Sequence, residues 1–225
     1  MIKAIIFDLD NTIVDFWKMK TMSIEAAVSA MIDAGLQMNH AEATAKLFRI
    51  YKVLGYEYYQ IFEEFLKKEI GKIDYKMLAN AIVAYRRVRD SFLEPYPGVL
   101  RTLLELKQKG LKLGILTDAS RLNAWIRLTT MKLDDFFDVV VTFDDTKRIK
   151  PHKFTFDKVL KELKVEASEV LMVGDNIDRD ILGASKLGMK TCFAKYGHDS
   201  NNLKTKNKIK ADYDILRFED ILTLI

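Results

Sequence analysis

Residues 5–12 read Ile-Ile-Phe-Asp-Leu-Asp-Asn-Thr, an apolar run followed by two aspartates, and this pattern is the starting point for predicting the fold. Its apolar part, from Ala4 to Phe7, has the length of a buried strand. Asp8 and Asp10 follow two residues apart, where extended backbone would point both side chains the same way. Two neighbouring carboxylates repel each other unless a cation or a shared proton compensates. The stretch therefore predicts a strand end with metal or acid/base chemistry, the alternative being a strand followed by an Asx turn.

In the rest of the chain, short apolar runs recur between helix-length amphipathic segments. This alternation is typical of parallel strands covered by helices on both faces, an α/β fold with an open, doubly wound sheet. Ligands of such sheets bind beyond the carboxyl ends of the strands. The expected strands are Ala4 to Phe7, Leu111 to Leu116, Val139 to Thr142, Val170 to Val173 and Thr191 to Ala194.

Residues 15–92 lack this strand pattern and show helical spacing of apolar residues instead. Asn39, with Glu42 three residues later, and Asp74 are candidate helix N-caps, and Gly71 marks a helix end. The expected helices begin near Thr21, Ala41, Gly55 and Tyr75.

Two domains follow from this organisation. Residues 1–14 and 93–225 are expected to form the α/β core, and residues 15–92 an inserted α-helical domain. The sequence Pro-Tyr-Pro-Gly at residues 95–98 predicts the turn by which the chain returns to the core.

Composition excludes several classes of protein. The chain has 225 residues, is 49% hydrophobic, and carries 36 basic and 32 acidic residues mixed along most of its length. A disordered chain and a nucleic-acid-binding arm are therefore not expected. The lysines within residues 204–210 are expected to form a solvated loop, or to attract anions weakly. With Cys192 as the one cysteine and no apolar signal or membrane segment near the N-terminus, we expect a cytoplasmic protein without a membrane partner.

Polar residues follow three more of the expected strands. Thr117 could donate a hydrogen bond to a phosphoryl oxygen, whereas Asp118 could equally cap a helix that starts at Ser120. Lys150, before a proline, would ordinarily be a surface residue. Asp175 follows a buried strand and a glycine and is a candidate ligand for a hard cation.

The order of these residues resembles the four-motif signature of the haloacid dehalogenase-like hydrolases. That order is carboxylate pair, hydroxyl, lysine, carboxylate, each at the end of a separate expected strand. The resemblance implies a Rossmann-like core and identifies residues 15–92 as the family's small helical cap. The motifs are Asp8 to Thr12, Thr117-Asp118, Lys150-Pro151 and Gly174 to Asp180.

The resemblance also implies a mechanism. Asp8 would be the nucleophile, and Asp10 would protonate the leaving oxygen and later accept a proton from water. Mg²⁺ would bind Asp8, the backbone carbonyl of Asp10, and Asp175. Asn176 and Asp180 would lie around this site without being primary ligands.

The phosphoryl group of the substrate would be held by the remaining motif residues. Thr117 and Lys150 are expected to be catalytic and to bind phosphate, together with Asn11, Thr12 and Asp118. The sequence departs from the usual pattern at Asn11 (often glycine), Asp118 (often asparagine), and Lys147 and Lys153 (often glycine and proline).

The implied activity is hydrolysis of a small-molecule phosphate ester. A 2-haloacid dehalogenase is disfavoured because those enzymes typically lack the second aspartate, Asp10. A phosphosugar mutase keeps the same motifs, and a non-enzymatic receiver-like phosphoacceptor is the alternative from another class. In the stretch 35–40, Gln37, Met38 or His40 is expected to contact the leaving group. The alternative is that this stretch only ends one helix at Gly35 and caps the next at Asn39.

Overall fold

The computed structural model describes residues 1–197 and 209–225. Three of the lysines expected in a solvated loop, Lys204, Lys206 and Lys208, lie outside these residues. The chain divides into two compact units. The core unit comprises Met1–Phe16 and Glu94–Ile225, and the helical unit comprises Trp17–Leu93.

The core unit contains a six-stranded parallel sheet with the strand order β3-β2-β1-β4-β5-β6. All four residues of β1 are buried, as its apolar sequence predicts for a central strand covered on both faces. The expected α/β class with a doubly wound parallel sheet is confirmed. The strands are β1 (Ala4–Phe7), β2 (Lys112–Leu116), β3 (Val139–Val141), β4 (Val170–Gly174), β5 (Lys190–Ala194) and β6 (Tyr213–Ile215).

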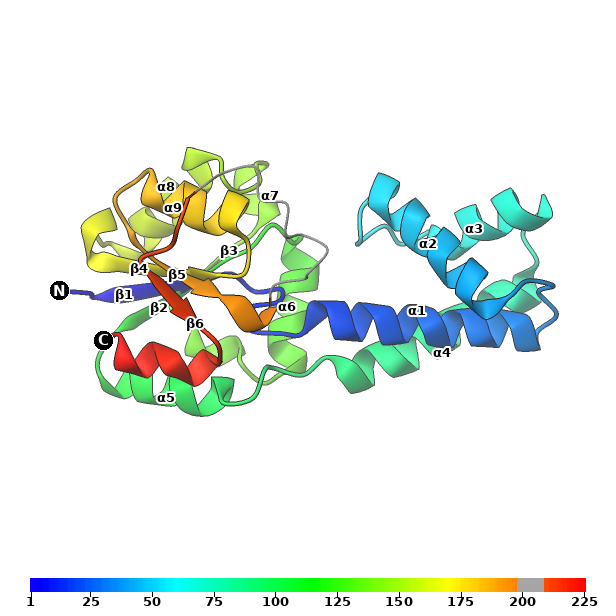
Figure 1. Ribbon diagram of the computed structural model, residues 1–225, viewed down its shortest axis with the longest axis horizontal. Helices are drawn as coiled ribbons and strands as arrows, with labels where there is room; N and C mark the ends of the chain where they lie inside the picture. Colours follow the sequence, from blue (N-terminus) through cyan, green and yellow to red (C-terminus); the bar gives the residue numbers. More distant parts are fainter. Residues whose placement is uncertain (198–208) are drawn as a thin grey trace. The chain divides into compact units, whose positions relative to one another are not determined.

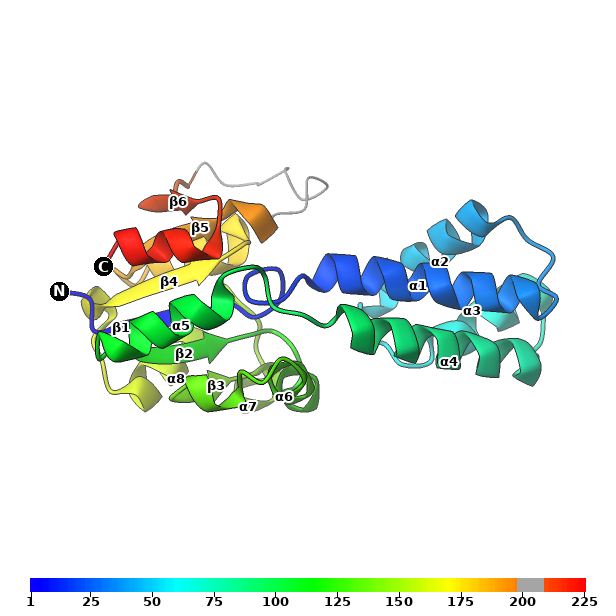
Figure 2. The same cartoon turned by 90° about the horizontal axis from the view of Figure 1, so that it is seen from below.

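Helices cover both faces of this sheet (Figures 1 and 2). On one face, α5 (Val99–Gln108) lies beside the 3₁₀ helix η6 (Phe218–Thr223). On the other, α8 (Lys153–Leu163) packs Phe156 and Val159 against strand residues that include Ile6. Among the described residues of this unit, the remaining helices are α6 (Arg121–Thr130), η1 (Asp134–Phe136), α7 (Phe143–Thr146), η2 (Ala167–Glu169), the π-helical turn η3 (Ile177–Ile181), α9 (Leu182–Ser185) and η4 (Lys195–Gly197).

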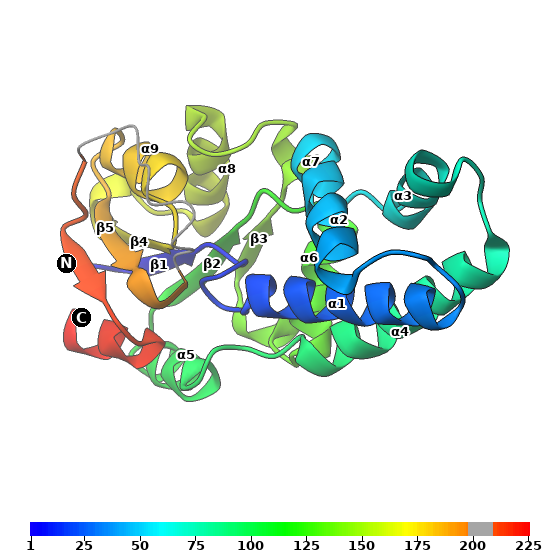
Figure 3. The same ribbon diagram turned by 45° about the vertical axis from the view of Figure 1, so that its right-hand side comes forward.

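The helical unit has its own apolar core, in which Ile24, Leu47 and Phe65 are fully buried. Its helices α1 and α4 run side by side in opposite directions (Figures 2 and 3). Helix α2 contacts α3. Within this unit, Met38 packs on the core and His40 Nε2 lies 3.2 Å from the carbonyl oxygen of Glu25. The helices are α1 (Phe16–Asp33), α2 (His40–Leu54), α3 (Ile61–Ile70) and α4 (Tyr75–Phe92).

The helix caps expected from the sequence are present. Asn39 accepts hydrogen bonds from two backbone N–H groups of α2, and Asp74 does the same for α4. Gly71 ends α3 with φ 74°, in the left-handed region that glycine adopts without strain.

Other expectations for the elements were wrong. Gly55 does not begin a helix but ends α2, and α3 starts only at Ile61, because residues 55–60 form turns. Helix α1 begins five residues earlier than expected, at Phe16. Strand β6 was missed since only three residues of it pair with β5, and two of these are exposed. Among the helices of the described residues, none combines the length and the apolar character needed to cross a membrane.

Candidate active site

The site lies where three central strands end. In the register of the sheet, Phe7 of β1 pairs with Ile115 of β2 on one side and with Val173 of β4 on the other. The residues that follow these strands therefore meet at one edge of the sheet. This pairing brings Asp8 and Asp175 together, as the sequence predicts for parallel strands.

Lys150 joins the site from the loop between α7 and α8, although a lysine at this position would ordinarily be exposed. It is 98% buried, and its Nζ lies 2.6 Å from Oδ1 of Asp8 and 2.8 Å from Oδ1 of Asp180. Nζ also donates to the carbonyl oxygen of Leu116 at 2.9 Å. Burial alone would lower the pKa of Lys150, but attraction from Asp180 and Asp8 outweighs it and raises that pKa. The ammonium therefore stays charged.

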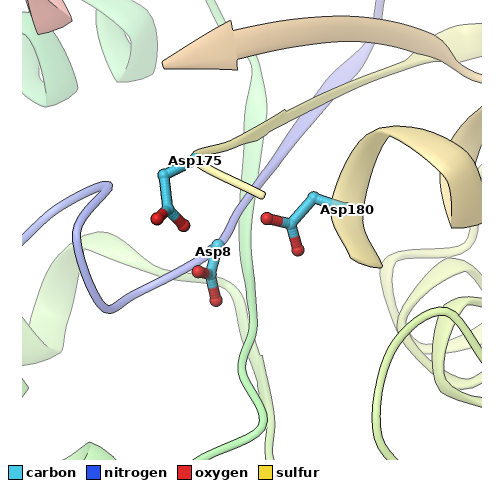
Figure 4. Close-up of side chains that lie close together, drawn as sticks. All are labelled: Asp8, Asp175 and Asp180. Atoms are coloured by element: carbon cyan, nitrogen blue, oxygen red, sulfur yellow. The ribbon is translucent and has the colours of Figure 1, made fainter. Parts of the chain in front are cut away.

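Both carboxylates that pair with the Lys150 ammonium belong to a cluster of three buried carboxylates. Asp8, Asp175 and Asp180 each present an oxygen within 4.8 Å of the others, and they lie close together in Figure 4. Burial, followed by repulsion from Asp8 and Asp180, raises the pKa of Asp175 to about 9. A set of buried carboxylate oxygens that repel one another fits a hard divalent cation, whose charge would offset the repulsion. The residues present therefore fit Mg²⁺.

Asp180 has a larger part in this cluster than the sequence indicated. The resemblance suggested a residue around the site, whereas the structure places its carboxylate among the candidate metal ligands. The π turn η3 directs it inward, and the missing side chain of Gly174 leaves room, since a Cβ there would overlap with the Asp180 carboxyl group. Asn176 instead caps η3 by accepting from the N–H of Arg179.

Asp10 pairs with a different cation from Asp8. Its Oδ2 accepts a hydrogen bond at 3.0 Å from Nη1 of Arg127, a buried arginine on α6. Asp10 is not a member of the three-carboxylate cluster. The guanidinium of Arg127 also lies over the ring of Phe16, 4.9 Å from its centroid.

The loop after β1 is contacted by Tyr196 and Gly197, two residues from the C-terminal part of the core unit. Asn11 adopts a positive φ of 59°, and Thr12 is fully buried. The hydroxyl of Tyr196 donates to the carbonyl oxygen of Thr12 at 2.8 Å. Gly197 packs so closely that a Cβ would overlap with the carbonyl oxygen of Asn11. These contacts fix the backbone path of residues 11 and 12.

The residues after β2 are also buried or paired. Thr117 is buried, and its Oγ1 accepts from the N–H of Ala119 at 3.1 Å. Asp118 does not cap α6, whose N-cap is Ser120. Its Oδ1 instead accepts from the backbone N–H of Lys150 at 2.9 Å, and its Oδ2 lies 3.2 Å from Nη1 of Arg179.

Two site residues were missed when the sequence was considered alone. Arg127 carries a detectable signal: it lies between Ala124 and Leu128 on the buried face of α6, where a charge requires a partner. Tyr196 carries none, because its contact with Thr12 joins residues 184 apart in the sequence.

Comparison with known proteins agrees with this geometry. A family model described as haloacid dehalogenase-like hydrolase matches residues 5–194. A glyceraldehyde 3-phosphate phosphatase of Methanocaldococcus jannaschii is 39% identical over 191 residues, which cover 85% of this chain and 84% of that protein. Pyrophosphatase PpaX of Bacillus mycoides is 31% identical over 232 residues, covering 100% and 97% of the two chains.

A solved structure shows the same fold. The crystal structure of a HAD phosphatase from Thermococcus onnurineus superposes with a TM-score of 0.67 at 26% identity, covering 99% of this chain and 97% of that one. The chain belongs to the haloacid dehalogenase-like hydrolase family, and it is an enzyme of the phosphatase branch of that family.

Proposed function

We propose that this enzyme is a magnesium-dependent phosphatase that hydrolyses a small-metabolite phosphate monoester through a phosphorylated Asp8. The observation that carries this proposal is the buried Asp8 carboxylate, 2.6 Å from Lys150 and clustered with Asp175 and Asp180. We further propose that residues 15–92 act as the small cap that the family resemblance implies.

Asp8 and Asp175 would hold Mg²⁺, with the backbone carbonyl of Asp10 as a third protein ligand and Asp180 in contact with the same cluster. When bound, the ion supplies positive charge that lets an anionic nucleophile approach an anionic phosphate. The raised pKa of Asp175 supports this assignment, because a bound cation would stabilise the ionised carboxylate against the burial and the repulsion from Asp8 and Asp180 that raise it.

The reaction would then proceed in two displacements. A carboxylate oxygen of Asp8 bonds to phosphorus as the bond from phosphorus to the leaving oxygen breaks, and Asp10 gives that oxygen a proton. Water next attacks phosphorus, Asp10 takes a proton from the water, and the Asp8 carboxylate is released with inorganic phosphate. Asp10 ends each cycle protonated, as it began.

The phosphoryl oxygens need donors that are already in place. Thr117 and Lys150 would supply a hydroxyl and an ammonium, and the backbone around Asn11 and Thr12 would supply N–H groups. For Asp118 we propose a positioning role in place of a phosphate contact, because its carboxylate accepts from Lys150 and pairs with Arg179. A carboxylate has no proton to donate to phosphate at neutral pH.

For the substrate we propose a small phosphorylated metabolite, and glyceraldehyde 3-phosphate is the first to test. The names of several relatives that are 30–39% identical to this chain support this choice. Pyrophosphate is the second to test, because the PpaX relative of Bacillus mycoides matches over the whole chain. The kcat/KM values of the two, measured with Mg²⁺ beside a panel of metabolite phosphates, decide between them.

The Asp8→Asn variant tests the mechanism. We expect it to fold normally and to lose essentially all phosphate release, since an amide is a poor nucleophile and a poor Mg²⁺ ligand. Asp157, a half-exposed aspartate on α8 that pairs with Lys153, offers the control Asp157→Asn, which should keep full activity. Near-normal turnover by Asp8→Asn would end the proposal.

A further inference from the structure

Arg127 is a charged residue in a place where packing alone calls for an apolar one. Its side chain is 7% exposed, and its neighbours on the same face of α6, Ala124 and Leu128, are fully buried. Burying a guanidinium is unfavourable unless it is paired and hydrogen-bonded, and well-packed apolar residues often serve stability as well or better. Stability of α6 therefore does not explain an arginine here.

Two contacts help to fix the position of the guanidinium. Nη1 donates to Oδ2 of Asp10 at 3.0 Å, and the ring of Phe16 lies 4.9 Å from the guanidinium carbon. A planar, delocalised cation stacked on an aromatic ring loses little further freedom when it forms a hydrogen bond. Arg127 thus offers Asp10 a preorganised partner.

We propose that Arg127 is a positioning residue, which holds the Asp10 carboxyl group in the orientation from which it gives its proton to the leaving oxygen. This inference rests on the proposed role of Asp10 as general acid. With Oδ2 directed to Arg127, Oδ1 carries the transferred proton. Asp8 has its own anchor in Lys150, so the two aspartates of the first motif are oriented by two different cations. Proton transfer slows when the acid is misplaced by about 1 Å. The orientation that Arg127 gives the Asp10 carboxyl group therefore affects the rate of this transfer.

A double-mutant cycle tests this role. Single variants Arg127→Met and Asp10→Asn, and the double variant, are assayed with nitrophenyl phosphate and with glycerol phosphate. The nitrophenyl leaving group needs no proton and the glycerol oxygen does. For glycerol phosphate we expect Arg127→Met to lower kcat by about 10- to 100-fold with little change in KM, as part of the 10²–10⁴-fold that a general acid supplies. For nitrophenyl phosphate the loss should be several-fold smaller.

The double-mutant cycle gives the most specific expectation. If Arg127 acts through Asp10, adding Arg127→Met to Asp10→Asn should not lower activity further. Additive losses, or an equal loss of kcat for both leaving groups, would overturn the positioning role.

Controls separate positioning from folding. Arg121→Met is the matched variant, since Arg121 lies on the same helix but is exposed and pairs with Asp145 at 2.5 Å; we expect it to keep wild-type kinetics. Each variant is checked by circular dichroism and thermal unfolding. In Arg127→Ala, added guanidinium at millimolar concentration should restore glycerol phosphate turnover, whereas failure to restore it in a folded variant counts against the proposal.

The outcomes also separate this inference from the proposed function. If Asp10→Asn shows no dependence on the leaving group, the acid role of Asp10 fails. If Asp10→Asn shows that dependence and the cycle is additive, only the role of Arg127 fails.

Discussion

Lys150 donates to Asp8 at 2.6 Å across 142 residues of sequence, and both side chains are buried. The same ammonium lies 2.8 Å from Asp180, so one positive charge pairs with two members of the three-carboxylate cluster. Because this charge is shielded little by water, its removal should have a larger effect than that of a surface lysine.

We therefore expect Lys150→Met to lower kcat/KM by about 10²–10³-fold, the loss typical of removing one preorganised donor to a transition-state oxyanion. Inhibition by inorganic phosphate should weaken as well. Lys153→Met is the control, because Lys153 is exposed and pairs with Asp157 on α8. Unchanged kinetics in Lys150→Met would mean that its burial is structural only.

The carboxylate cluster predicts a response to Mg²⁺. In Asp175→Asn the Mg²⁺ concentration for half-maximal activity should rise at least about tenfold, because a ligand of the hard cation is lost. Wild-type protein should also gain about 2.7 kcal/mol of unfolding free energy when Mg²⁺ is present at 100 times its Kd. Magnesium titrations of activity and of the thermal midpoint measure both, with Asp157→Asn as control. Superimposable curves for Asp175→Asn and wild type would remove Asp175 from the metal site.

Gly197 predicts a backbone effect at the catalytic loop. In Gly197→Ala the added Cβ would overlap with the carbonyl oxygen of Asn11, so the loop of residues 11 and 12 must shift. We expect a loss of about 1–3 kcal/mol in unfolding free energy, typical of overpacking, and reduced activity. Tyr196→Phe, which removes only the hydrogen bond to Thr12, should be milder at about 1 kcal/mol. Denaturant unfolding and kcat/KM give both values, and a fully active, stable Gly197→Ala would contradict the close packing.

The cap of α4 predicts an effect on stability alone. Asp74→Ala removes an acceptor at 3.0 Å for two backbone N–H groups of α4 and should lower the unfolding free energy of the helical unit by about 1 kcal/mol. Asp33→Ala is the control, because Asp33 is the last residue of α1, where a carboxylate gains nothing from the helix dipole. Urea unfolding should show a lower midpoint for the Asp74 variant only, and equal midpoints would argue against the cap.

The sequence by itself determined the strands that position the site. The apolar run that ends before Asp8 is visible locally, because a strand buried on both faces must be apolar throughout. The same holds for the runs before Thr117 and Asp175. Because these strands are parallel neighbours, their carboxyl ends lie at one edge of the sheet. The order of the motif residues then indicated which side chains form the site at that edge. The buried lysine, Lys150, could be singled out only through that order.

Which cation each carboxylate pairs with could be seen only in the tertiary structure. Nothing local distinguishes Asp8 from Asp10, yet Lys150 pairs with the former and Arg127 with the latter. The inward direction of Asp180 depends on a π turn, and the hold on Thr12 depends on Tyr196, far along the chain. Such contacts arise from how helices and loops pack on the finished sheet, which residue spacing along the chain does not encode.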